Sequence, residues 1–125
     1  MKNRINIIGR LGRDPEKKFT PSGQEVCNFT VATSRKYTKA EETVEETIWF
    51  RIETWGKLAN VCGQWLQKGA LVDIEGRMKP VRVYTKQDGT ADAQLEISAD
   101  SVTFLSGTRG KEQQEAAPAE DNVPF

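Results

Sequence analysis

The chain has 125 residues, with 18 basic side chains, 18 acidic side chains and no histidine. This length allows one domain and a short extension. No apolar run approaches the ~18 residues of a membrane helix, and the apolar stretch after residues 1–4 is too short for a signal peptide, so we expect a cytoplasmic protein without a membrane segment. Without histidine, most zinc sites and most acid–base catalysis at neutral pH are excluded.

The first half of the chain begins with two predicted strands. Residues 4–10 are mostly β-branched and form the first strand, which is followed by turn signals at residues 14–15 and 21–23. Residues 26–34 alternate between apolar and polar side chains and form the second strand. Residues 35–46 are polar and charged, so we expect a protruding hairpin loop there.

The third predicted strand, residues 47–55, has the clearest alternation. One side is entirely apolar and belongs in a core or in a subunit contact: Ile48, Phe50 and Ile52. The opposite side presents two tryptophans with an arginine between them: Trp49, Arg51 and Trp55.

Residues 57–67 predict a helix, because their apolar side chains recur three and four positions apart. Lys68-Gly69 gives the signal that ends it. Trp65 lies on the apolar stripe of this helix, so we assign its ring to the core.

Two strands complete the predicted fold, at residues 71–78 and 95–105. Between them, residues 81–85 resume β character and lead to a turn at residues 87–89. The apolar phase of the last strand changes along its length, which predicts a β-bulge near Asp100-Ser101.

Three strands, one helix and two strands predict an all-β fold. The arrangement with this order is a five-stranded Greek-key barrel with one α-helix between strands three and four, the oligonucleotide/oligosaccharide-binding (OB) fold. Another small barrel with the same element order is the alternative. We therefore expect residues 1–106 to form an OB-fold domain.

The remaining reactive side chains give little sign of catalysis. Cys27 and Cys62 lie on apolar stretches and are expected to be buried free thiols, not a disulfide or a metal site. The four glutamates within residues 41–46 admit a metal-dependent nuclease, but in a flexible loop a solvated charge run is the better interpretation. We expect no enzyme activity, no metal and no cofactor, since no nucleophile has a histidine base.

Aromatic and basic side chains are combined on the expected outer surface. A protein that holds single-stranded nucleic acid needs flat apolar surfaces for the bases and cations for the phosphates. Trp49, Arg51 and Trp55 offer both, and Tyr37 and Tyr84 lie in segments rich in arginine and lysine. The alternative is that the two tryptophans face a second subunit or cover the barrel.

The C-terminal stretch differs in composition from the rest of the chain. Residues 107–119 are Gly, Ala, Gln and charged residues without apolar periodicity, which predicts a disordered linker. Residues 107–125 hold two of the basic and four of the acidic side chains, so residues 1–106 retain 16 basic against 14 acidic. In residues 120–125, acidic side chains are followed by Val-Pro-Phe. We expect this tip to act as a bait: its apolar end would bind in a pocket of a partner protein, and its carboxylates would meet basic residues at the rim of that pocket. The alternative is a frayed end without a function.

Seven short motifs run along the chain: IGRLGRDPE (8–16), NFTVATS (28–34), TIWFR (47–51), WGKLA (55–59), KG (68–69), IEGR (74–77) and the acidic tip ending in Pro124-Phe125. Together they resemble the motifs of bacterial-type single-stranded DNA-binding proteins. The match covers nearly all of the chain, and the motifs are specific only in combination.

This resemblance implies roles for particular side chains. The base-stacking aromatic residues are Trp49, Trp55, Tyr37 and Tyr84. The basic positions along the DNA path are Arg51, Lys57, Lys68 and Arg77. The tip that recruits replication, repair and recombination enzymes is Asp121, Asn122, Val123, Pro124 and Phe125.

The family's usual assembly is a homotetramer, with Phe50 near the subunit contacts. Three features depart from the family pattern: Asn122 stands where a second aspartate is common, the linker is short, and residues 77–84 form a stretch one residue longer.

These features predict a protein that binds and protects single-stranded DNA, largely independent of sequence, during replication, repair and recombination. The alternative is an OB-fold replisome adaptor, a protein-interaction module with weak DNA binding. Quenching of tryptophan fluorescence by oligo-dT distinguishes the two, because stacked bases quench indoles.

Overall fold

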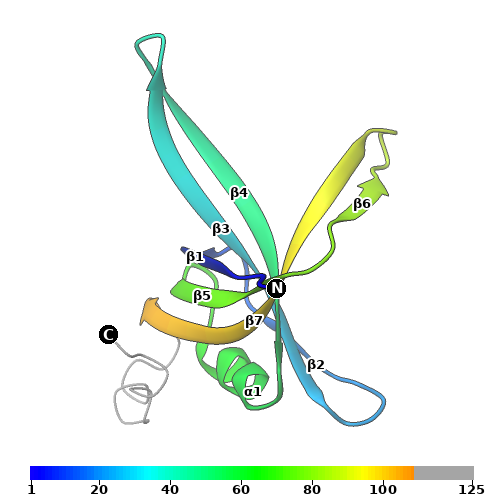
Figure 1. The fold of residues 1–125 in the computed structure, drawn as a ribbon. Helices are drawn as coiled ribbons and strands as arrows, with labels where there is room; N and C mark the ends of the chain where they lie inside the picture. Colours follow the sequence, from blue (N-terminus) through cyan, green and yellow to red (C-terminus); the bar gives the residue numbers. More distant parts are fainter. Residues whose placement is uncertain (109–125) are drawn as a thin grey trace.

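The structure is a computed structural model that describes residues 1–108, drawn in colour in Figure 1. The predicted tip at residues 120–125, and the linker from residue 109 onward, lie outside the described residues. Seven strands and one helix follow in chain order within residues 1–108: β1 (Ile5–Leu11), β2 (Glu16–Phe19), β3 (Glu25–Lys39), β4 (Glu42–Trp55), α1 (Gly56–Trp65), β5 (Leu71–Met78), β6 (Arg82–Thr85) and β7 (Ala91–Ser106).

Five of these strands close into a barrel. The sheet runs β1-β5-β7-β4-β3, and β1 returns to β3 through the pairs Arg10↔Ala32 and Leu11↔Val31. β4 and β7 pair in parallel, while the other strand pairs are antiparallel. Helix α1 connects β4 to β5, the third and fourth strands of the barrel, and lies at one end of it (Figure 1). The predicted five-stranded OB-fold barrel is therefore confirmed.

The segment predicted as a hairpin loop, residues 35–46, is instead an extension of β3 and β4. The ladder continues without a register shift to Lys39↔Glu42, and Ala40 and Glu41 turn the chain with φ values of 52° and 66°. Positive φ at both central residues matches the strand twist of two-residue hairpins. The sequence signal was missing because neither face of this hairpin is buried, so no apolar alternation marks its strands.

A second hairpin leaves the barrel beside the first. β6 pairs with the beginning of β7 from Arg82↔Gln94 to Thr85↔Ala91, close to the predicted segment 81–85. Figure 1 shows the β3/β4 hairpin and the β6/β7 hairpin diverging from the barrel as two arms. The short strand β2 pairs antiparallel with the first part of β3, on the edge of β3 opposite to β4.

The core fills the barrel with the inward side chains of its strands. Phe29, Val31, Ile52, Val72 and Phe104 are all buried in one cluster. Along β7 the inward phase changes as predicted, because Glu75 pairs with Ser101 and Gly76 pairs with Ala99, which leaves Asp100 as the bulged residue. The bulge allows apolar side chains on both sides of it to face the same interior.

Helix α1 covers one end of this core. It begins one residue before the predicted segment and ends at Trp65, and Leu66 caps it in an extended conformation. Trp65 is partly buried against the core, as predicted. Cys27 and Cys62 are buried free thiols. Burial raises the pKa of Cys27 to about 11 and raises the pKa of Cys62 further still.

The end of the described chain is attached to the barrel. The Gln67 side-chain amide donates to the carbonyl oxygen of Gly107 over 3.0 Å, and Thr108 is buried. Within residues 1–108, no helix has the length and apolar character needed to span a membrane. No group of three or more potential metal ligands forms among these residues either.

Candidate nucleic-acid interface

The outer side of β4 carries the predicted aromatic and basic residues. Trp49 is 54 % exposed and Trp55 is 39 % exposed, so both indole rings face outward from the barrel. Arg51 lies between them on the same side and is partly exposed. The exposure follows from the strand period: Phe50 and Ile52 point into the core, which turns their neighbours to the surface.

A groove lies between the two hairpin arms and reaches the barrel. It has a volume of about 450 Å³, and we call it the inter-hairpin groove. Trp49 and Arg51 line it from β4, and Tyr84 lines it from β6. The structure thus brings Tyr84 to the same groove as Trp49 and Arg51, from which it is distant in the sequence. Its other lining residues come from β3, β4 and β7: Thr30, Thr47, Ile48, Phe50, Asp92, Ala93, Gln94 and Leu95.

Tyr84 is fixed to its own hairpin by a polar contact. Its hydroxyl donates to Oδ2 of Asp92 over 3.5 Å, and Lys86 forms an ion pair of 3.3 Å with the same oxygen. The backbone N–H of Ala93 and the Lys86 side chain hold the pKa of the Asp92 carboxyl below its usual value. Asp92 therefore stays charged, and the Tyr84 ring remains 45 % exposed beside it.

The ring of Trp49 lies directly over Gly12, just after β1. A Cβ atom built on Gly12 would stand 2.5 Å from Cζ3 and 2.8 Å from Cη2 of the indole. Only a glycine leaves room for the ring in this position. Sequence analysis missed this role; the signal that could have found it is the pair Gly9 and Gly12 at the end of the first strand, since glycine in a strand is typical of close backbone approach.

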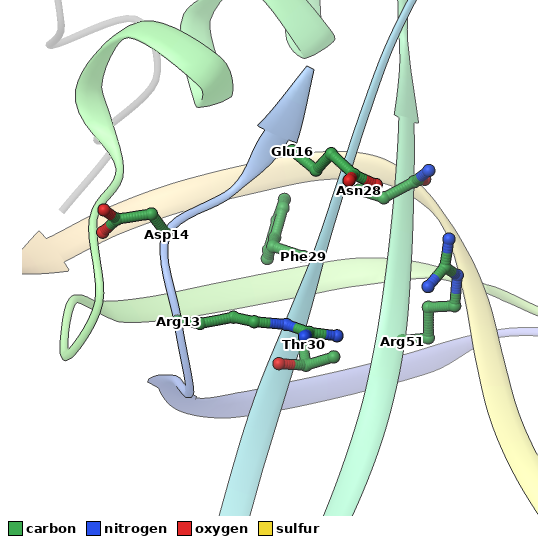
Figure 2. Close-up of a pocket in the computed structure, with 7 residues that line it drawn as sticks. All are labelled: Arg13, Asp14, Glu16, Asn28, Phe29, Thr30 and Arg51. Atoms are coloured by element: carbon green, nitrogen blue, oxygen red, sulfur yellow. The ribbon is translucent and has the colours of Figure 1, made fainter. Parts of the chain in front are cut away.

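A smaller pocket of about 160 Å³ lies on the other side of Arg51. Figure 2 shows Arg13 extending across β3 toward Arg51, with Thr30 beneath and Asn28 beyond. Because Arg51 lines both hollows, it joins the pocket to the inter-hairpin groove. Arg13 adds a cation that sequence analysis did not select. The remaining lining residues are Asp14, Glu16 and Phe29.

Two carboxylates, Glu96 and Glu53, form ion pairs with the cations on this surface. Glu96 forms ion pairs with Arg51 at 3.7 Å and with Arg82 at 3.4 Å. Glu53 accepts hydrogen bonds from Nε1 of Trp55 at 3.1 Å and from Nζ of Lys79 at 3.2 Å. Sequence analysis missed the partners Glu96 and Lys79, because they reach Arg51, Arg82 and Glu53 only through the pairing of separate strands.

The structure does not bring Tyr37 to the same side of the hairpin as Trp49. Partners in an antiparallel ladder share a face, and Trp49 pairs with Ala32 while Tyr37 pairs with Val44. Tyr37 therefore faces the opposite side of the arm. The Arg35 guanidinium covers its ring at 4.9 Å and pairs with Glu46 at 2.7 Å.

The three remaining predicted cations are exposed but scattered. Arg77 lies on the outer face of β5, and its partner Ser98 pairs in turn with Glu53 of β4. Lys57 is at the start of α1, directly after Trp55. Lys68 follows the helix, where its backbone N–H donates to Asp14 over 2.8 Å. Arg77 and Lys57 thus lie close to the outer face of β4, and Lys68 lies near the small pocket.

A closed five-stranded barrel with its helix between the third and fourth barrel strands places the protein in the OB-fold class. The model of the Single-strand binding protein family matches residues 2–105. The chain belongs to this family.

Relatives agree with the family match. The chain is 42 % identical over 120 residues to the Single-stranded DNA-binding protein of Neisseria meningitidis, covering 95 % of this chain and 67 % of the relative. It is 37 % identical over 107 residues to Single-stranded DNA-binding protein 1 of Synechocystis sp., covering 86 % of each. Among solved structures, it is similar to the Plasmodium falciparum SSB complex with ssDNA, with a TM-score of 0.72 and 25 % identity over 85 % of this chain and 97 % of that one.

Proposed function

We propose that this protein binds single-stranded DNA, largely independent of sequence, and does so without catalysis. The observation that carries the proposal is the half-exposed indole of Trp49 on the wall of the inter-hairpin groove, with Arg51 and Tyr84 beside it. A stacked base contributes about 1–3 kcal/mol, and every base has a face to stack. The names of the relatives and the solved complex support the same function.

The strand would pass through the groove and along the outer face of β4. One base would stack on Trp49 and another on Trp55, with Arg51 receiving a phosphate between them. Arg77 and Lys57 would attract the backbone beside this path, and Lys68 would extend it past the small pocket. Tyr84 would stack from the second arm.

Tyr37 would join this path only where the strand crosses to the other side of the arm. One face of its ring is covered by Arg35, and the residue lies on the other side of the arm from Trp49. A base would therefore stack on the uncovered ring face, or displace the guanidinium.

The experiment that tests this function is titration of the protein with oligo-dT, followed by tryptophan fluorescence. Trp49 and Trp55 should be quenched, while the partly buried Trp65 provides residual emission. An unchanged signal, with no binding detected by anisotropy of a labelled oligonucleotide, would instead favour the OB-fold adaptor.

We further propose that the protein works as a homotetramer in replication, repair and recombination. On the apolar side of β4, the Phe50 side chain is only 8 % exposed and packs mainly in the barrel core. The Ile48 side chain is 41 % exposed and is therefore available for a subunit contact. Light scattering with and without oligo-dT measures the assembly and its occupancy together. A monomer under both conditions would refute the tetramer.

A further inference from the structure

A buried carboxylate links β4 to β6 beside Arg51, one of the residues that line the inter-hairpin groove. The Glu96 side chain, on β7, is only 7 % exposed. It pairs with Nε of Arg51 on β4 at 3.7 Å and with Nη2 of Arg82 on β6 at 3.4 Å. Among the ion pairs within residues 1–108, Glu96 is the only carboxylate shared by two arginines, and its side chain is the least exposed.

Both arginines are well placed to receive an anion from solution. Arg51 lines the inter-hairpin groove, and Arg82 is 65 % exposed two residues before Tyr84 on the same strand. A guanidinium binds carboxylate and phosphate with the same planar donor geometry. A phosphate that enters the groove therefore meets cations that already have an anionic partner.

The two neighbouring acidic side chains are arranged differently. Asp92 pairs with Lys86 at 3.3 Å and is 45 % exposed, and Glu53 pairs with Lys79 at 3.2 Å. Neither carboxylate forms an ion pair with Arg51 or Arg82. Within residues 1–108, Glu96 is therefore the only carboxylate that forms an ion pair with either of these two arginines.

We propose that Glu96 is a positioning residue that occupies the anion position shared by Arg51 and Arg82 in the free protein. A phosphate of the bound strand displaces its ion pairs and takes over the two guanidinium groups. The carboxylate thereby holds the arginines beside the groove, and it lowers both the affinity for DNA and the dependence of that affinity on salt. This inference rests on the proposed function.

The test is Glu96→Gln, which keeps the shape of the side chain and removes its charge. Oligo-dT binding is measured by anisotropy across a salt series, with Glu75→Gln as the matched control, since Glu75 pairs with Arg4 at 3.3 Å outside the groove. Glu96→Gln should bind more tightly at low salt, with a plot of log K against log salt steeper by about 0.7 for each phosphate that the two arginines neutralise, because no carboxylate has to be displaced from them. Between about 50 and 200 mM salt, its affinity should then fall about threefold more than that of the wild type for each such phosphate.

Several outcomes would overturn the inference. A residue with a purely structural role would give weaker binding, a lower melting temperature and an unchanged slope. If Glu96→Gln and Glu75→Gln changed binding equally, Glu96 would act only through the net charge of the protein, and the inference would be wrong. If the wild type binds no oligo-dT, the proposed function itself fails, so the two failures are distinguishable.

A second variant keeps the test valid if Glu96→Gln is too unstable to assay. Arg82→Ala removes an exposed side chain at little risk to the barrel and leaves Glu96 paired with Arg51 alone. It should weaken binding and make the salt slope shallower by about 0.7. An unchanged slope would show that Arg82 binds no phosphate, and the inference would be wrong.

Discussion

Gly12→Ala is the substitution that tests the site with the least change to the chain. Gly12 has no positive φ, so alanine fits its backbone, and the only consequence is the added methyl group. That carbon would stand 2.5 Å from Cζ3 of Trp49, whereas carbon atoms in contact are about 3.5–4.0 Å apart. The ring must therefore move by about 1 Å or more. Since Trp49 is at the surface, we expect it to move without unfolding the barrel.

The expected cost in binding follows from the displaced ring. If the base on Trp49 is lost altogether, the affinity for oligo-dT falls by about 1–3 kcal/mol, from about fivefold to about 150-fold. The assay is anisotropy of a labelled oligo-dT, because the intrinsic fluorescence changes with the ring itself. Gly63→Ala in α1 is the matched control, since its new methyl would meet the flexible Lys17 side chain at 3.2 Å and Sγ of Cys27 at an ordinary contact distance of 3.7 Å.

A double-mutant cycle separates the ring from other effects of the methyl group. In a Trp49→Ala background, Gly12→Ala should cost little further, because the indole atoms are gone and only Oγ1 of Thr30, at 3.3 Å, remains close to the new methyl. Wild-type affinity in Gly12→Ala would refute the reasoning. So would an equal loss with and without the Trp49 ring.

The remaining predictions concern other parts of the chain. Trp49→Ala and Trp55→Ala should each weaken oligo-dT binding by about 1–3 kcal/mol in the anisotropy assay; wild-type affinity in both would remove them from the site. Deletion of residues 123–125 should leave oligo-dT binding intact and abolish recruitment of partner enzymes in pull-down experiments, and retained partners would contradict the bait hypothesis. Burial raises the pKa of Cys27 from 9.0 to about 11, so the unfolded chain loses its thiol proton first and stability should fall as pH rises through this window. Urea unfolding measures this loss, which a Cys27→Ala/Cys62→Ala variant should show to a smaller extent.

The sequence predicted those parts of the fold in which one face is buried. The period-two alternation of residues 47–55 placed Trp49 outside and Ile52 inside, and the phase change near Asp100 located the bulge. The same reasoning failed for residues 35–46, because a hairpin exposed on both faces has no alternation to detect.

The sequence predicted individual residues of the candidate site, but not the contacts that position them. Residue types pointed to Trp49, Arg51 and Tyr84, and the structure brings them to one groove. The contacts that position them come from remote segments: Gly12 under the Trp49 ring and Glu96 beside Arg51. The side on which Tyr37 lies required the register of the ladder, which residue spacing alone does not give across a turn of unknown length.

The unbroken ladder of β3 and β4 also determines how the longer arm moves. The pairing runs from Val26↔Trp55 in the barrel to Lys39↔Glu42 at the tip, with no register shift and no loop between them. Because the ladder is unbroken where the arm leaves the barrel, we expect no hinge there. We expect the arm to deform by twisting along its whole length, so that a ligand bound near its base also restrains its tip.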